Sequence, residues 1–222
     1  MKILAFEGSP RSNANSSIML KHFIMGADIS GTGVNRINVN KLNVYPCSGC
    51  LRCNLIKRCS LRGDDWENLS RSIHEADVIV ISSPVYFFHF PSKLKMVLDR
   101  FRSFINVKIT EHGLIHTPWI EWKKDFVLLL SMGSPNEREG KGMVDSMEFI
   151  VKELGEGNRL FTFSGTRLAI SGQLEFGVEK LTSLYEKLGI PVNLVENDKK
   201  RNDKLLTEIY NLGEKLGGPN GG

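Results

Sequence analysis

The chain lacks any long hydrophobic run. None of its 222 residues belongs to an apolar stretch near the roughly 20 residues that a membrane-spanning helix needs. The first residues lead straight into a strand-like segment at 3–6, which leaves no room for a targeting segment. The net charge is only +4, and no basic stripe is interleaved with aromatic residues, so neither a membrane nor nucleic acid is an expected partner. We therefore expect a cytoplasmic protein.

The chain also lacks the common arrangements of catalytic side chains. It has no Ser/His/Asp spacing, no zinc-protease helix and no convincing carboxylate pair. No catalytic residue is assigned, and we expect the chemistry to come mainly from bound cofactors. Internal repeats are absent too, and the length suits one domain over residues 1–216, followed by a flexible Gly-rich tail at 217–222.

Five short apolar runs alternate with helical patterns along the chain. The runs lie at 3–6, 34–39, 78–81, 126–130 and 160–163, the last with an optional extension at 168–170. Strands that are apolar throughout and alternate with amphipathic helices indicate a parallel sheet covered on both faces. We predict an α/β, flavodoxin-like, doubly wound sheet of five parallel strands in the order 2-1-3-4-5. Segment 104–125 fits none of these elements and is expected to form an excursion.

Cysteine is confined to one short segment, where the spacing is C-x2-C-x2-C-x5-C. The four residues are Cys47, Cys50, Cys53 and Cys59. Four thiolates on one loop suit an iron–sulfur cluster, and the first three have the spacing of a bacterial ferredoxin. Structural zinc favours two separated C-x2-C pairs, and a reducing cytosol disfavours disulfides, so both rank behind a cluster and behind free thiols.

The first loop of the predicted sheet's carboxyl edge, Gly8–Ser17, is rich in hydroxyl and amide side chains. It precedes a helix, whose first N–H groups and dipole favour an anion. It lacks both the nucleotide P-loop and the G-x-G-x-x-G dinucleotide pattern, so a terminal monophosphate such as that of FMN fits best. Ordinary capping of the helix by Ser or Asn is the alternative. The candidate phosphate ligands are Ser9, Arg11, Asn15, Ser16 and Ser17.

Two further loops are expected at the same edge. Segment 82–91 carries four aromatic residues between two prolines, which suits a flat ring ligand, a core cover or a subunit interface. Segment 131–140 offers small residues and backbone donors. The cysteine loop follows the second strand, so we expect it at this edge as well, beside the other loops.

These motifs together resemble the iron–sulfur flavoproteins of the NADPH-dependent FMN reductase superfamily. The resemblance covers about residues 1–170 and rests on Gly8-Ser9-Pro10-Arg11, the cysteine run with Asp64-Asp65, Ser83-Pro84-Val85-Tyr86, and Asp99-Arg100. It implies a flavin-dependent oxidoreductase with FMN at the rim loops and a [4Fe–4S] cluster on the four cysteines. It also implies a homodimer or tetramer, with ferredoxin or NAD(P)H as electron donor and a small-molecule acceptor.

The resemblance also implies roles for particular residues. Around the flavin ring it places Pro84, Val85, Tyr86 and Phe87 on one side and Ser131, Met132 and Gly133 on the other. Arg100 is expected to brace a helix or an interface. Two alternatives stay open: a cluster-free NAD(P)H-dependent flavin, quinone or azo reductase, and a thiol- or zinc-based sensor that is not an enzyme.

Overall fold

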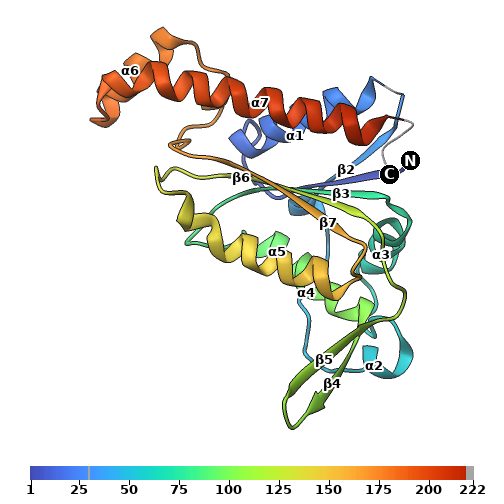
Figure 1. Cartoon of the computed structure of the whole chain (residues 1–222). Coiled ribbons are helices and arrows are strands. Elements are labelled where there is room, and N and C mark those ends of the chain that lie inside the picture. Colours follow the sequence, from blue (N-terminus) through green and yellow to red (C-terminus); the bar gives the residue numbers. More distant parts are fainter. Residues whose placement is uncertain (30, 219–222) are drawn as a thin grey trace.

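A computed structural model describes residues 1–29 and 31–218. Its centre is a parallel sheet in the order β2-β1-β3-β6-β7 (Figure 1), which confirms the predicted flavodoxin-like topology. β1 lies between β2 and β3, with Ile3 beside Val34 on one side and Val78 on the other. The strands of this sheet are β1 (Ile3–Glu7), β2 (Val34–Asn38), β3 (Val78–Pro84), β6 (Asp125–Ser131) and β7 (Arg159–Gly165).

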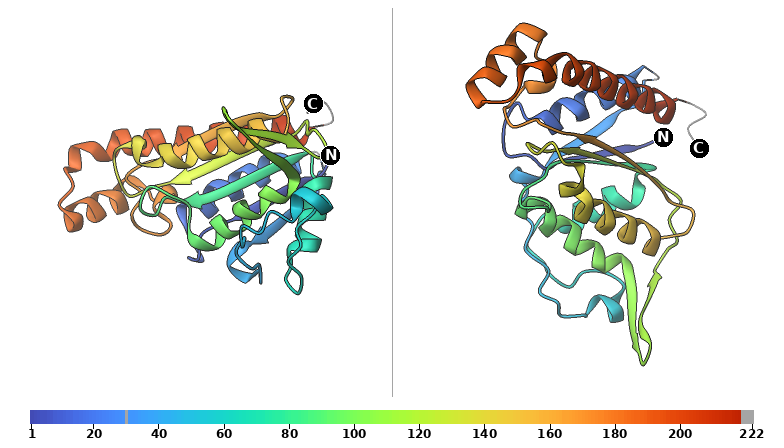
Figure 2. Two further views of the ribbon diagram at one scale, coloured as in Figure 1. Left: turned by 90° about the horizontal axis from the view of Figure 1, so that it is seen from below. Right: turned by 60° about the vertical axis from the view of Figure 1, so that its left-hand side comes forward.

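Helices cover both faces of the sheet, as its fully apolar central strands require. Alternate side chains of β1 show this: Ile3 and Ala5 pack under α1 and α7, whereas Leu4 and Phe6 face the opposite layer of α3, α4 and α5. Figures 1 and 2 show these two layers. The main helices are α1 (Asn15–Asp28), α3 (Trp66–Glu75), α4 (Ser92–Arg100), α5 (Lys141–Glu153), α6 (Val178–Leu188) and α7 (Val195–Gly217).

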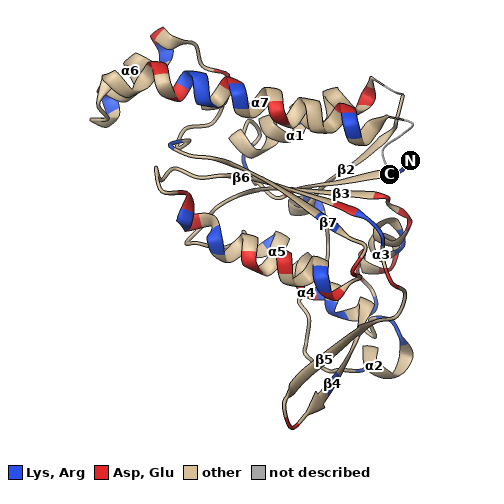
Figure 3. Ribbon diagram, in the orientation of Figure 1, with Lys and Arg blue, Asp and Glu red and all other residues tan. Residues whose placement is uncertain are grey.

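α1 and α7 pack unusually closely against each other. A Cβ on Gly26 would lie 2.1 Å from the Tyr210 carbonyl oxygen, and one on Gly213 would lie 2.2 Å from that of Phe23. Only glycine allows two helix backbones to approach so far. Charged side chains of both signs lie along α5 and α7 (Figure 3), and none of the described helices is apolar enough over a sufficient length to span a membrane.

Segment 104–125 forms a β-hairpin, which the sequence did not predict. Its antiparallel strands are β4 (Ile105–Thr110) and β5 (Gly113–Pro118). The hairpin projects from the body of the molecule beside the short helix α2 (Cys53–Ile56), which belongs to the cysteine segment (Figure 2). It follows α4 through the 3-10 turn η2 (Phe101–Phe104).

Short 3-10 turns complete the fold. They are η1 (Val39–Lys41), η3 (Glu137–Gly140), η4 (Gln173–Glu175) and η5 (Val192–Leu194). The optional strand extension at 168–170 is wrong, because β7 ends at Gly165 and the chain turns there into a loop. Of the predicted tail, Gly217 is the last residue of α7, and residues 219–222 lie outside the described residues.

Candidate functional site

A cavity of about 180 Å³ opens at the carboxyl edge of the sheet. It lies where β1, β3, β6 and β7 end, which is the usual ligand position in an open α/β sheet. Eight of the predicted cofactor residues line it, together with four residues that the sequence did not indicate. The lining residues are Ser9, Arg11, Ala14, Asn15, Pro84, Val85, Tyr86, Ser131, Gly133, Leu168, Ala169 and Ser171. We call this the rim cavity.

The first turn of α1 carries unsatisfied donors, although Ser16 and Ser17 lie behind Ala14 and Asn15 and are not among the residues that line the rim cavity. Its N-cap is Ala14, which has no side-chain oxygen to accept from the free N–H groups. The hydroxyl oxygens of Ser16 and Ser17 are buried, and neither has a hydrogen-bond partner among residues 1–29 and 31–218. Buried polar groups normally have partners. An anion at this helix end would satisfy both hydroxyls and the backbone donors, so the residues present fit a phosphate group.

Ser9 and Arg11 shape the loop before this helix. The Ser9 hydroxyl oxygen accepts a hydrogen bond from the Arg11 backbone N–H at 3.2 Å, which closes a tight turn. The exposed Arg11 guanidinium donates to the carbonyl oxygen of Ala169 at 3.4 Å, on the far side of the rim cavity. Ser9 and Arg11 thus both line the rim cavity, and their role as phosphate ligands stays a prediction.

Asn15 is committed to the protein itself. Its side-chain amide donates to the carbonyl oxygens of Leu168 and Ile170 at 3.2 and 2.9 Å, and its amide oxygen accepts from the Leu174 N–H at 3.0 Å. These bonds fix the loop after β7 against α1. The prediction of Asn15 as a phosphate ligand stays a prediction, whereas its role in positioning this fourth rim loop is visible.

The aromatic loop after β3 is a tight hairpin. Tyr86 and His89 exchange backbone hydrogen bonds of 3.0 Å, and the two residues between them, Phe87 and Phe88, have φ of +47° and +64°. Bulky side chains rarely adopt this left-handed conformation, so the turn is strained. Phe87 is fully exposed at its tip and does not line the rim cavity, unlike Tyr86. The tip thus points outward from the cavity.

The loop after β6 contributes mainly backbone. The Met132 N–H donates to the Gly165 carbonyl oxygen, and the Met132 carbonyl oxygen accepts from the Leu168 N–H, both at 2.9 Å. Its side chain is buried, so Met132 lies behind the cavity wall while Ser131 and Gly133 line it. The sequence missed Leu168, Ala169 and Ser171 as lining residues, since residues 168–170 were expected as an optional strand extension. The end of β7 is the signal that would have found them.

The four cysteines surround a second, smaller cavity of about 30 Å³. Cys47 and Cys50 are exposed, Cys59 is half-buried and Cys53 is buried, and all four are free thiols. Within residues 1–29 and 31–218 no group of three or more His, Cys, Asp or Glu side chains is gathered tightly enough to hold a single metal ion. We call this the cysteine cavity, and its wall includes Arg100 and Arg102.

Arg100 is the most unusual residue of this wall. It is 1% exposed, and its Nη1 donates to Asp64 Oδ2 at 2.7 Å and to the Tyr45 carbonyl oxygen at 2.9 Å. Its guanidinium lies over the Trp66 ring at 4.9 Å. Its Nε and Nη2 have no hydrogen-bond partner in the described part of the chain. Arg100 does brace the α4 end, as expected, and it also lines the cavity of the four thiols.

The β4–β5 hairpin clamps the cysteine segment from outside. The Asn54 side chain both donates to the Val107 carbonyl oxygen at 2.8 Å and accepts from the Val107 N–H at 3.1 Å. Arg102 donates to Asn54 Oδ1 at 2.8 Å and lies 3.5 Å from Cys53 Sγ. Segment 104–125 thus anchors the short helix that begins at Cys53, a role that its sequence did not reveal.

The thiols differ in acidity. The Ser60 hydroxyl, followed by backbone N–H groups and Ser48, lowers the pKa of Cys50 to about 7. Burial raises the pKa of Cys53, which the Arg102 guanidinium only partly offsets. A metal ligand must be a thiolate, so cationic and hydrogen-bonding neighbours favour ligation. Four thiols next to Arg100 and Arg102 are a donor set that fits an iron–sulfur cluster, which is anionic when held by four thiolates.

The cysteine cavity does not lie at the carboxyl edge, contrary to our expectation. The chain after β2 passes Ser9, where Asn40 donates to the Ser9 carbonyl oxygen at 2.9 Å, and then turns away. The cavity lies at Arg100, the last residue of α4, whereas the rim loops precede Ser92, its first residue. Nine helical residues span roughly 14 Å. The prediction assumed that the loop after β2 stays at the carboxyl edge of the sheet. The cysteine segment is long enough to reach the other end of α4 instead.

Comparisons with known proteins agree with this architecture. The model of the family described as NADPH-dependent FMN reductase matches residues 1–139. An iron-sulfur flavoprotein of Archaeoglobus fulgidus is 29% identical over 142 residues, which are 63% of this chain and 60% of that protein. One of Methanocaldococcus jannaschii is 31% identical over 102 residues, 46% of this chain and 52% of that protein. The match thus spans little more than half the length of these curated relatives.

A solved structure extends the likeness of fold to almost the whole chain. The azoreductase from Bacillus anthracis str. Sterne superposes with a TM-score of 0.63 at 14% identity, over 97% of this chain and 99% of that one. At this identity the likeness concerns the fold. The molecule is thus a protein with a flavodoxin-like fold. It belongs to the NADPH-dependent FMN reductase family, a family of flavin-dependent oxidoreductases, as the sequence predicts.

Proposed function

We propose that this protein is an FMN-dependent oxidoreductase that carries a [4Fe–4S] cluster and passes electrons between flavin and cluster. The observation that carries the proposal is the cysteine cavity, in which the four free thiols share a wall with Arg100, whose Nε and Nη2 have no hydrogen-bond partner among residues 1–29 and 31–218. Two buried guanidinium N–H groups without hydrogen-bond partners in the described part of the chain are costly beside neutral thiols. They become favourable beside an anionic cluster, so the cavity is better explained with the cluster than without it.

At the rim cavity the chain's own groups would bind and orient FMN. Ser16 and Ser17 would donate their hydroxyls to the phosphate, and Arg11 would neutralise part of its charge. Tyr86 and the backbone of Gly133 lie on opposite loops of the cavity, where a flat ring could be held between them. FMN, when bound, supplies two-electron and one-electron chemistry, which no side chain of this cavity provides.

At the cysteine cavity Cys47, Cys50, Cys53 and Cys59 would hold the cluster, and Arg100 and Arg102 would compensate its charge. The buried wall of Arg100 and Cys53 would keep water from one side. Hydrogen bonds and positive charge near cluster sulfurs raise the reduction potential. These two arginines therefore favour the reduced state of the cluster.

The separation of the two cavities supports assembly with a second copy of the chain. Within one chain they lie at opposite ends of α4, and Phe87 and Phe88 expose aromatic surface next to the rim. We propose that a homodimer or tetramer covers these rings and shortens the path between flavin and cluster. Light scattering would show a multiple of the chain mass, and a monomer at micromolar concentration would contradict this. Ferredoxin and NAD(P)H as donors stay predictions.

Anaerobic purification followed by iron, acid-labile sulfide and FMN assays tests the proposal. We expect iron and sulfide in equal amounts and one FMN per chain, with a broad visible absorption beneath the flavin bands. Retained FMN without iron would leave a cluster-free NAD(P)H-dependent reductase. Zinc in place of iron, without flavin, would leave the thiol- or zinc-based sensor.

A further inference from the structure

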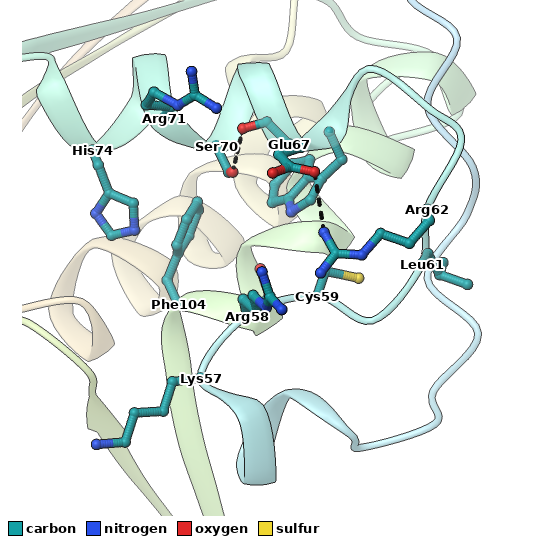
Figure 4. A pocket seen from close by; sticks show the side chains of 12 residues that line it. Lys57, Arg58, Cys59, Leu61, Arg62, Glu67, Ser70, Arg71, His74 and Phe104 are labelled. Carbon is teal, nitrogen blue, oxygen red and sulfur yellow. Dashed lines mark hydrogen bonds and ion pairs between the residues drawn. The ribbon is translucent and has the colours of Figure 1, made fainter.

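A third cavity, of about 280 Å³, lies on the outer side of the cysteine segment. One wall is α3 and the other is the chain from Lys57 to Arg62 (Figure 4). Cys59 lines both this cavity and the cysteine cavity, so a molecule bound here would lie against one of the four thiols. Neither the FMN rim nor the proposed cluster ligands explain this space.

Four of the twelve residues that line this outer cavity are cationic. Lys57, Arg58, Arg62 and Arg71 line it, and Glu67 is the carboxylate among the lining residues. Figure 4 shows Glu67 bonded to Arg62, a pair that is 3.1 Å apart. The other three cations have no ion pair with a carboxylate in the described part of the chain. The cavity therefore has an excess of positive charge that a bound anion would neutralise.

The inner surface of the same cavity is aromatic. Trp66 is 3% exposed and Phe104 is 4% exposed, so both present only an edge or a small area to it. The His74 ring stands edge-on to Phe104 with a centroid separation of 4.7 Å. Apolar ring edges beside cationic side chains suit a planar aromatic ligand better than inorganic phosphate, which would make no use of the rings.

We propose that this cavity binds a small planar aromatic anion, with its acid group toward Arg58 and its ring toward Phe104 and Cys59. The volume approaches that of ordinary small-molecule pockets, roughly 300 Å³ and above, and the space is concave. An acidic protein would need a broader surface and would leave the hollow unfilled. The proposal concerns binding alone and does not depend on whether the thiols hold a cluster.

Calorimetric titration of the purified, FMN-loaded protein with naphthalene-2-sulfonate tests this. This probe is redox-inert, so binding is measured without turnover. We expect naphthalene-2-methanol, the neutral analogue, to bind about tenfold more weakly or worse, and rising salt to weaken only the sulfonate. Arg58→Gln/Arg71→Gln should weaken the sulfonate about tenfold or more. Lys187→Gln/Lys204→Gln removes the same charge from α6 and α7 and should leave its affinity unchanged.

A cavity-filling variant separates this proposal from its rivals. Ser70→Phe keeps all four cations but places a ring in the space that the probe would occupy, and we expect it to abolish binding. Equal affinity for sulfonate and alcohol, or affinity unchanged in Ser70→Phe, would overturn the proposal. Binding of poly-glutamate that persists in Ser70→Phe, without sulfonate binding to the native chain, would assign the face to an acidic macromolecule instead. Iron and FMN contents should be unchanged in every variant.

Discussion

The rim cavity and the cysteine cavity are built in different ways. The rim cavity follows from the sheet: four parallel strands end together, and a helix begins with free donors beside them. The cysteine cavity depends on side chains of an inserted segment, chiefly the Asp64–Arg100 pair and the Asn54–Arg102 contact. We infer that the rim cavity is formed before its ligand binds. The cysteine segment, in contrast, becomes fully ordered only when it binds its cluster.

The largest expected difference concerns Cys59→Ala. It removes one of four cluster ligands and should reduce iron and sulfide to background while FMN stays bound, because the rim shares no lining residue with the cysteine cavity among the described residues. Metal analysis and flavin absorbance on anaerobically purified protein measure this. Ser48→Ala alters the same cavity without removing sulfur and should keep the iron. Loss of FMN together with iron would show that the two sites form as one unit.

The next largest effect is on folding stability. Arg100→Met leaves the Asp64 carboxylate, whose side chain is 1% exposed, without its cation. Breaking one side of a buried pair costs about 3–5 kcal/mol of unfolding free energy. Urea unfolding of the iron-free protein measures it, and Arg100→Met/Asp64→Asn should recover most of the loss. An equally unstable double variant would mean that packing of Arg100, rather than its charge, is what matters.

The same pair predicts a pH dependence. Burial alone would raise the pKa of Asp64, but hydrogen bonds from Arg100 and from the Tyr45 N–H outweigh it and lower that pKa. A carboxyl whose pKa is lowered on folding stabilises the native state above its unfolded value, near pH 4, and loses this contribution as the pH falls through its folded value. The stability advantage of the native chain over Arg100→Met should therefore shrink below about pH 4.

At the rim cavity, a double serine variant should change FMN affinity without lowering folding stability. Ser16→Ala/Ser17→Ala removes two buried hydroxyls that have no partner in the described part of the chain. Each hydrogen bond to a charged phosphate is worth about 1.5–3 kcal/mol, so FMN affinity should fall about tenfold or more per hydroxyl. The flavin-free protein should melt at the same temperature or higher, since no internal hydrogen bond is lost.

Asn15→Ala is the matched contrast, because it loses three hydrogen bonds to the loop at 168–174. It should lower both the FMN affinity and the melting temperature of the flavin-free protein. Fluorescence titration and thermal melting measure both quantities. A fall in stability in the serine variant as large as in the asparagine variant would show that these hydroxyls act in folding rather than in phosphate binding.

The sequence predicted the rim far better than the cysteine cavity, and the reason is physical. Strand-like runs such as Val78–Ile81 and turn residues such as Pro84 are local signals, and the rule that ligands bind where parallel strands end does the rest. The Asp99-Arg100 motif marked Arg100 as a bracing residue, but no local pattern placed Arg100 or Arg102 beside the cysteines. Arg100 is brought to Asp64 by the fold, across 36 residues of chain.

The hairpin and the fourth rim loop show the same limit. Residues 105–118 alternate only weakly in burial, so their pattern did not identify strands, and their function lies in contacts with Asn54. Leu168 and Ile170 resembled a strand in composition, yet Asn15 ties their carbonyl groups into a loop. Long-range hydrogen bonds determine the conformation of both segments, and hydrophobic periodicity along the sequence gives no information about such bonds.

The smallest expected difference lies within the cysteine cavity itself. In iron-free protein under reducing conditions, alkylation of Cys50 should rise with pH around a midpoint near its pKa of about 7, because Ser60 and nearby N–H groups stabilise its thiolate. Burial raises the pKa of Cys53, so it should react roughly tenfold more slowly at pH 7. Mass spectrometry of iodoacetamide-treated protein measures both rates.

The control variant Ser60→Ala should raise the pH midpoint of Cys50 alkylation and leave the alkylation rate of Cys53 unchanged. Faster labelling of Cys53 than of Cys50 would mean that the hairpin clamp opens readily, and that the cysteine segment is ordered mainly by the ligand it binds.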